Sequence, residues 1–274
     1  MNKIIKSFFF TCKKICESIL PTRLLAFMSE HIIPIKVIDV SGKKLKYYCL
    51  GTLPLYRYET LFTKEPETIE WIDSFDPNSV LWDIGANVGI YSVYAANKGI
   101  DVVAVEPMPS NFYTLTKNIE INNISEKVSA FCIALTNEVC IDYFYISTAQ
   151  IGASQNSFKE QIGWDYSKLE GYQYKHTTLG FSIDKFVETF NPKIPNYIKI
   201  DVDGLEKNIL LGASKTLANP VVRSMLIELN TDWKDYKDIL NFVLSCGFTR
   251  WDKRRADIFA NSEMKNSYNH IFYK

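Results

Sequence analysis

One short string in the sequence has residue types and spacing suited to binding a nucleotide. It reads Asp83-Ile-Gly-Ala-Asn-Val-Gly89 and begins inside an apolar run, Val80–Ile84, that is typical of a buried strand. Gly85 permits a tight turn that a Cβ would obstruct, and Gly89 allows the following helix to pack closely. Backbone N–H groups at the start of that helix would face a ligand, and Asp83 could accept hydrogen bonds from a ligand amine, directly or through water.

An acidic residue closes the next apolar run, 102–105. Glu106 follows Gly89 by 17 residues and precedes Pro107. A carboxylate about 20 residues past a glycine turn is placed to bind both hydroxyls of a ribose. The alternative, an ordinary strand–helix turn with a solvated Glu106, does not account for strand, turn, helix, strand and carboxylate in one register.

The middle position of the turn distinguishes between nucleotides. Dinucleotide sites use Gly-x-Gly-x-x-Gly, and the middle glycine lets the backbone approach a pyrophosphate. Here the spacing is Gly85, Asn87, Gly89. Asn87 argues against an NAD-dependent oxidoreductase and for S-adenosylmethionine, whose methionine end would meet Asp83 and the turn.

Methyl transfer from a sulfonium chiefly requires that the acceptor be positioned, and a hydroxyl acceptor also benefits from a base. Asp201 follows the apolar run Tyr197–Ile200, and Lys199 shares its face in an extended strand. We expect Asp201 to orient the acceptor or act as its base, supported by Lys199. Alternatively Asp201 caps the next helix, although Asp203, with Glu206 three residues later, better resembles a capping box.

A further carboxylate ends the neighbouring run, 224–229. Glu228 would reach the acceptor or brace the loop of Asp201. With Asp201 and Asn230 it also offers hard oxygen ligands, so Mg²⁺-assisted transfer is an open alternative. Otherwise no metal site is expected, because the three histidines and scattered cysteines do not form a zinc pattern.

Apolar strands alternate with amphipathic helices along most of the chain. This predicts an α/β fold with a mostly parallel sheet covered by helices on both faces. The expected strands are 80–84, 102–105, 128–134, 197–200, 224–229, 248–251 and 270–273, and the expected helices are 65–75, 90–97, 111–122, 205–217 and 235–246. A hairpin is expected at 35–50.

The stretch 140–180 is polar, aromatic and irregular in pattern. Such an insertion is usually a lid or substrate loop, so Trp164, Tyr166 and His176 are candidate substrate-binding residues. The alternative is a surface excursion without a role. Just before it, Ala134 would read the adenine edge and Asn137 would line the pocket.

The strings described above form a set with one further segment. They are Asp83-Ile-Gly-Ala-Asn-Val-Gly89, Glu106-Pro107, Asn118, Asn122, Ala134-Leu-Thr-Asn137, Lys199-Ile-Asp-Val-Asp-Gly204, Leu211-Gly-Ala-Ser214 and Glu228. Together they resemble the FkbM family of S-adenosylmethionine-dependent methyltransferases over roughly residues 55–230. The resemblance implies a class I methyltransferase (Rossmann-like) fold, a seven-stranded sheet with one antiparallel strand, and O-methylation of sugar or polyketide-type hydroxyls. Asp203 stands where the family more often has Glu, and the first 50 residues and the insertion are not covered.

Residues 1–20 carry a helical pattern with one apolar arc and lysines opposite. This helix would dock on its own domain or rest on an anionic membrane surface. The apolar run is too short for a signal peptide or a membrane span, so we expect a cytoplasmic protein, with peripheral contact at the inner face of the membrane as the alternative.

The 274 residues carry 31 basic and 31 acidic side chains, so no global charge favours a nucleic-acid partner. We expect an N-terminal extension at 1–75 and a methyltransferase domain at 76–274. The expected function is methylation of a hydroxyl on a small-molecule or glycan acceptor, most plausibly a sugar of a surface polysaccharide or glycolipid. Polyketide-like hydroxyls and a non-catalytic nucleotide-binding module are the alternatives, and the oligomeric state is left open.

Overall fold

The computed structural model describes residues 3–163, 167–168, 171–262 and 264–274. The chain forms two compact units, Met1–Ile35 and Lys36–Lys274. The smaller unit contains α1 (Lys3–Ile19) and α2 (Thr22–His31), with Pro21 at the N-cap of α2. In the described part of the chain, no helix is both long and apolar enough to cross a membrane. The predicted boundary near residue 75 remains a prediction.

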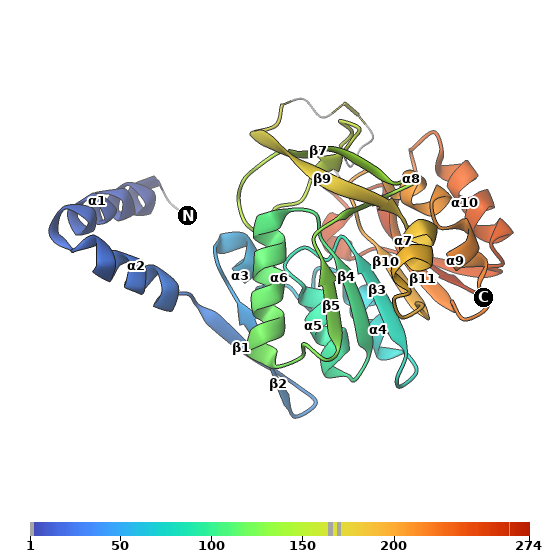
Figure 1. Ribbon diagram of the computed structural model, residues 1–274, viewed down its shortest axis with the longest axis horizontal. Coiled ribbons are helices and arrows are strands. Elements are labelled where there is room, and N and C mark those ends of the chain that lie inside the picture. Colours follow the sequence, from blue (N-terminus) through green and yellow to red (C-terminus); the bar gives the residue numbers. More distant parts are fainter. Residues whose placement is uncertain (1–2, 164–166, 169–170, 263) are drawn as a thin grey trace. The chain divides into compact units, whose positions relative to one another are not determined.

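The larger unit is built on a seven-stranded sheet (Figure 1). Its order is β12-β13-β11-β10-β3-β4-β5, and β13 alone runs antiparallel to the other six strands. The strands are β3 (Val80–Ile84), β4 (Asp101–Val105), β5 (Val128–Phe131), β10 (Tyr197–Ile200), β11 (Ser224–Asn230), β12 (Arg250–Arg254) and β13 (Ser267–Tyr273). The predicted fold is therefore confirmed.

Both faces of this sheet are buried, which explains why its central strands are almost continuously apolar. Alternate residues point to opposite sides: Leu81 joins one core cluster, whereas Trp82 and Ile84 join the other. One face is covered by α4 (Pro66–Asp73), α5 (Ile90–Asn97) and α6 (Pro109–Asn122), and the other by α7 (Ile183–Phe190), α8 (Glu206–Leu211), α9 (Ser214–Ala218) and α10 (Tyr236–Ser245). A short 3-10 turn, η1 (Asp257–Phe259), precedes β13.

The single helix predicted at 205–217 is wrong, because the chain forms α8 and α9 with a break between them. The break contains Gly212, where an added Cβ would lie 2.3 Å from the backbone oxygen of Thr136. The chain therefore turns at Gly212, where it passes close to the backbone of Thr136. The predicted strand 128–134 is also divided, since β5 ends at Phe131 and Ala134 begins a strand of another sheet.

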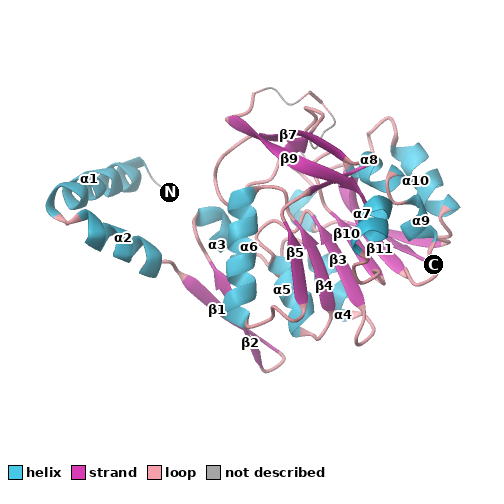
Figure 2. Cartoon of the chain, in the orientation of Figure 1, coloured by secondary structure: helices cyan, strands magenta, loops and turns pink. Residues whose placement is uncertain are grey.

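The stretch predicted to be irregular at 140–180 instead contributes three strands to a second sheet (Figure 2). This sheet has the order β6-β9-β7-β8, formed by β6 (Ala134–Thr136), β7 (Cys140–Ile146), β8 (Ser157–Phe158) and β9 (Tyr174–Ser182). The long pair β7 and β9 is antiparallel in register from Cys140↔Gly180 to Ile146↔Tyr174. The inner side of this sheet is buried and carries Phe144, Ile146 and Phe158.

The predicted hairpin is present as β1 (Ile35–Val40) and β2 (Lys43–Tyr48). Two asparagines of α6 bind the backbone of β2: Asn122 Oδ1 accepts from Lys46 N at 2.8 Å, and Asn118 Oδ1 from Tyr48 N at 2.6 Å. Asn118 and Asn122, which belong to the motifs of the resemblance, thus attach the hairpin to α6. The chain continues through Gly51 into α3 (Thr52–Glu59), which reaches the site described next.

Candidate active site

A cavity of about 280 Å³ lies at the carboxyl ends of the central strands, where ligands bind in open α/β sheets. Its wall combines the turn after β3, the ends of β4, β10 and β11, the start of β6, the loop 152–156 and one side of α3. The predicted site residues on this wall are Gly85, Asn87, Glu106, Pro107, Ala134, Asp201 and Glu228.

The glycine turn brings β3 and β10 into close contact. Gly85 has a φ of +79°, and a Cβ there would lie 2.0 Å from the backbone oxygen of Asp201. Gly89, with a φ of +82°, has Leu115 of α6 as its near neighbour, so the missing Cβ lets the start of α5 lie close to α6. Asn87 Nδ2 donates to Ala153 O at 3.0 Å, which connects the turn to the loop over the cavity.

Glu106 is nearly buried, and its two oxygens accept from Asn87 N at 2.8 Å and Met108 N at 2.9 Å. Burial raises the pKa of Glu106 to about 7, against the effect of these donors. A carboxylate has about four lone-pair sites, so these two backbone donors do not exhaust its acceptor capacity. Ribose binding by Glu106 stays a prediction.

Asp83 lies behind the turn and not on the cavity wall. It is fully buried, and Ser92 Oγ donates to its Oδ2 at 2.6 Å. Among the described residues its Oδ1 has no hydrogen-bond partner, and burial raises the pKa of this carboxyl despite the nearby charge of Lys199. Asn137 is exposed beside β6 and also lies off the wall.

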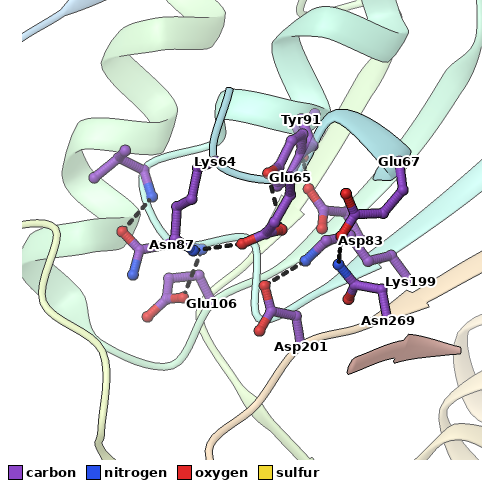
Figure 3. A network of polar contacts seen from close by, with 12 residues as sticks. Lys64, Glu65, Glu67, Asp83, Asn87, Tyr91, Glu106, Lys199, Asp201 and Asn269 are labelled. Atoms are coloured by element: carbon purple, nitrogen blue, oxygen red, sulfur yellow. Dashed lines mark hydrogen bonds and ion pairs between the residues drawn. The ribbon is translucent and has the colours of Figure 1, made fainter. Parts of the chain in front are cut away.

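Lys199 and Asp201 form an ion pair at the end of β10 (Figure 3). The Lys199 Nζ lies 2.6 Å from Asp201 Oδ2, and the lysine side chain is almost completely buried. Burial alone would raise the pKa of Asp201, but the charges of Lys199 and Lys64 lower it overall. Burial and the negative charge of Asp201 raise the pKa of Glu228, which shares a hydrogen bond with Asp201. The pKa values of these two neighbouring carboxyls are therefore shifted in opposite directions.

Several charged groups of this network come from the segment before β3 and were missed by the sequence reasoning. Lys64 pairs with Glu65, and Tyr91 OH donates to Glu65 Oε2 at 2.9 Å (Figure 3). Glu67 lies next to them and accepts from Asn269 Nδ2 at 2.8 Å. No spacing signal identifies these residues, because they follow α3 and have no fixed offset from the glycine turn.

Asp203 also lines the cavity, and its role differs from the predicted capping box. Its Oδ2 accepts from Gln155 N, so it binds the loop 152–156. The N-cap of α8 is Leu205, which makes no side-chain capping bond. Burial and the charge of Asp201 raise the pKa of Asp203 to about 6.

The predicted substrate residues do not meet in this cavity. His176 lies on β9 with its ring 5.5 Å from that of Phe144, outside the cavity wall. Trp164 and Tyr166 fall outside the described residues. Asn230 Oδ1 accepts from Asp232 N at 2.9 Å, and the described ranges contain no group of three or more His, Cys, Asp or Glu side chains arranged to hold a metal ion.

Comparison with known proteins assigns this arrangement to a class. The family model described as the methyltransferase FkbM domain matches residues 83–249, more than half of the chain. A hexuronic acid methyltransferase, AglP, from Haloferax volcanii is 25% identical over 207 residues, covering 75% of this chain and 79% of that protein. Methyltransferase 1 of Beauveria bassiana is 24% identical over 185 residues, covering 64% of this chain and 74% of that protein.

Among solved structures, M. capricolum TrmK in complex with S-adenosyl-homocysteine aligns with 76% of this chain and 67% of its own, at 10% identity and a TM-score of 0.44. The family match and the sheet order define a class I, S-adenosylmethionine-dependent methyltransferase. The chain belongs to the FkbM methyltransferase family, as the motifs predicted.

The cavity fits this cofactor. Gly85 lets the turn lie directly against the backbone of Asp201, and Glu106 keeps acceptor capacity beyond its two backbone donors. Asn87 and Pro107 flank that carboxylate, and Ala134 lies on the wall at the start of β6.

Proposed function

We propose that this enzyme methylates a hydroxyl oxygen on a sugar of a surface polysaccharide or glycolipid. The supporting observation is Asp201, an ionised carboxylate on the cavity wall whose side chain is still 34% exposed. When bound, S-adenosylmethionine supplies a methyl group already activated as a sulfonium. The task left to the protein is to hold the acceptor in line with it.

Asp201 is suited to orienting the acceptor. Because Lys199 and Lys64 lower its pKa, the carboxylate stays ionised and accepts a hydrogen bond from the acceptor hydroxyl. A carboxylate of low pKa is a weak base, so orientation outweighs complete proton removal before transfer. Glu228, whose pKa is raised, shares a hydrogen bond with Asp201 and keeps its carboxylate in place.

The hexuronic acid methyltransferase relative supports a sugar acceptor. A polyketide-like hydroxyl remains the second candidate, and magnesium assistance through Asp201 and Glu228 remains an alternative mechanism. Experiment can distinguish the two acceptor classes and the two mechanisms.

The test is transfer of labelled methyl from S-adenosylmethionine to a panel of glycans and polyketide-type alcohols. We expect label in a base-stable ether of a glycan. Asp201→Asn should lower kcat by about 10²- to 10⁴-fold while S-adenosylhomocysteine still binds. Asp238→Asn, on the exposed side of α10, is the matched control. Full activity of Asp201→Asn would refute the assigned role, and loss of activity in a chelator would favour the metal alternative.

We also propose that residues 1–20 contact an anionic membrane surface, which would bring the enzyme to a lipid-linked acceptor. The supporting observation is that Phe8, Ile15 and Ile19 are exposed on α1 together with Lys13 and Lys14.

A further inference from the structure

The cationic residues among the described lining of the cavity are Arg57 and Lys64. Lys64 is already paired with Glu65. Lys199, behind the wall, is paired with Asp201. Arg57 belongs to α3, which lies outside the matched family domain, and no ion pair joins it to any residue the structure describes.

Arg57 is held in position by the loop over the cavity. Its Nε donates to Gly152 O at 2.9 Å, and Gly152 N donates to Asn111 Oδ1 at 2.7 Å. Gly152 has a φ of +82°, and a Cβ there would lie 3.0 Å from Leu53 Cβ. The loop can therefore approach α3 closely enough to fix the guanidinium.

The remaining donors of this guanidinium have no protein partner among the described residues. An arginine carries five N–H donors in a planar fork, and Nε accounts for one of them. The charge of Arg57 acts on Glu106 and Asp203, where it opposes the rise in pKa that burial causes. The guanidinium thus faces the cavity interior, yet no carboxylate in the described chain pairs with it.

We propose that Arg57 is a carboxylate-binding residue of this cavity. A guanidinium fork matches a carboxylate with two parallel hydrogen bonds. Two ligands can supply the carboxylate: the methionine part of the cofactor, or an acidic sugar acceptor. The second source rests on the proposed function, whereas the first rests only on the cofactor.

The experiment measures binding to the full chain by calorimetry. S-adenosylhomocysteine carries the amino-acid carboxylate, and 5′-methylthioadenosine lacks it. If Arg57 binds the cofactor carboxylate, Arg57→Gln raises the Kd of S-adenosylhomocysteine about 10- to 100-fold and leaves that of 5′-methylthioadenosine unchanged. Arg57→Lys, which keeps the charge but loses the fork, gives an intermediate change. Arg250→Gln, on exposed β12, is the control.

The second arm uses glucuronate and glucose, measured by ligand-observed NMR with S-adenosylhomocysteine bound. If Arg57 binds the acceptor carboxylate, Arg57→Gln weakens glucuronate at least tenfold, without an effect on glucose or on S-adenosylhomocysteine. Unchanged binding of both carboxylate ligands in folded Arg57→Gln overturns the proposal. A wild-type chain that binds no sugar refutes only the acceptor arm, and the cofactor arm still decides on Arg57.

Discussion

Lys199 places a positive charge inside the main sheet, in register with Asp83 on β3. Burial alone would lower the pKa of this lysine, but Asp201, Asp83 and Glu65 raise it overall. Removing one partner of a buried pair leaves the other charge uncompensated, which costs more than the pair itself contributes. The sequence pattern predicted that Lys199 shares a face with Asp201, but not the depth at which the lysine lies.

We expect Lys199→Met to lower the free energy of unfolding by about 3–5 kcal/mol, because Asp201 would lose its buried partner. Denaturant titration measures this. Lys237→Met, on the exposed side of α10, should change it by less than about 0.5 kcal/mol. Adding Asp201→Asn to Lys199→Met should recover part of the loss, and equal losses in single and double variants would contradict the coupling.

Glu106 predicts a pH dependence of cofactor binding. Its pKa of about 7 lies above the ordinary value of 4.5, so the carboxylate is mostly protonated below pH 7. Ribose binding uses the ionised form, and its fraction rises about tenfold between pH 6 and pH 8. We therefore expect S-adenosylhomocysteine to bind about tenfold more tightly at pH 8 than at pH 6.

Glu106→Gln should bind more weakly than the wild type and lose most of this pH dependence. Calorimetry at three pH values tests both statements, and an unchanged slope would assign the titration to Asp203 instead. The raised pKa of Glu106 also affects the free energy of unfolding. Because the pKa is higher in the folded state, the stabilising contribution of Glu106 is present below about pH 4.5 and is lost as pH rises through about 7.

At the scale of elements, those with a regular apolar pattern were predicted from the sequence. The predicted strand 80–84 and helix 90–97 agree with β3 and α5 at both ends. The second sheet escaped prediction because its outer side carries exposed apolar residues such as Ile141 and Leu179, which obscure the two-residue alternation. Arg57 and Lys64 escaped because tertiary folding alone brings them to the cavity.

The glycine turn allows a controlled test at this scale. Gly85→Ala places a Cβ against the Asp201 backbone, so it should destabilise the fold and abolish S-adenosylhomocysteine binding. Gly99 also has a positive φ, +91°, but nothing lies within 4 Å of its added Cβ. Gly99→Ala should therefore cost only about 1 kcal/mol of backbone strain and leave binding intact. Equal effects in thermal melts would contradict the steric argument.

At the scale of the whole molecule, the smaller unit carries basic and exposed apolar side chains that do not line the catalytic cavity. Segment 1–28 has five basic residues and one acidic residue. No side chain of α2 is buried, and Leu24 and Phe27 are exposed. Apolar burial at the lipid interface, together with about 1 kcal/mol for each basic residue near anionic lipid, can hold such a segment on a membrane.

We expect the full chain to sediment with vesicles containing phosphatidylglycerol but not with pure phosphatidylcholine, and to be released by high salt. Ile19→Asp should reduce binding at least tenfold. Val139→Asp, at another exposed apolar position, before β7, is the control and should bind as the wild type does. Equal binding to both kinds of vesicle would contradict the charge argument.

The two backbone bonds to Glu106 have a consequence for the energetics of recognition. They join the turn after β3 to the turn after β4 within the folded chain itself. The ordering entropy of these turns is therefore spent during folding and not at the moment of association. In hydrogen–deuterium exchange, the amides of Asn87 and Met108 should already be slow in the ligand-free enzyme, so the nucleoside docks into a preorganised receptor.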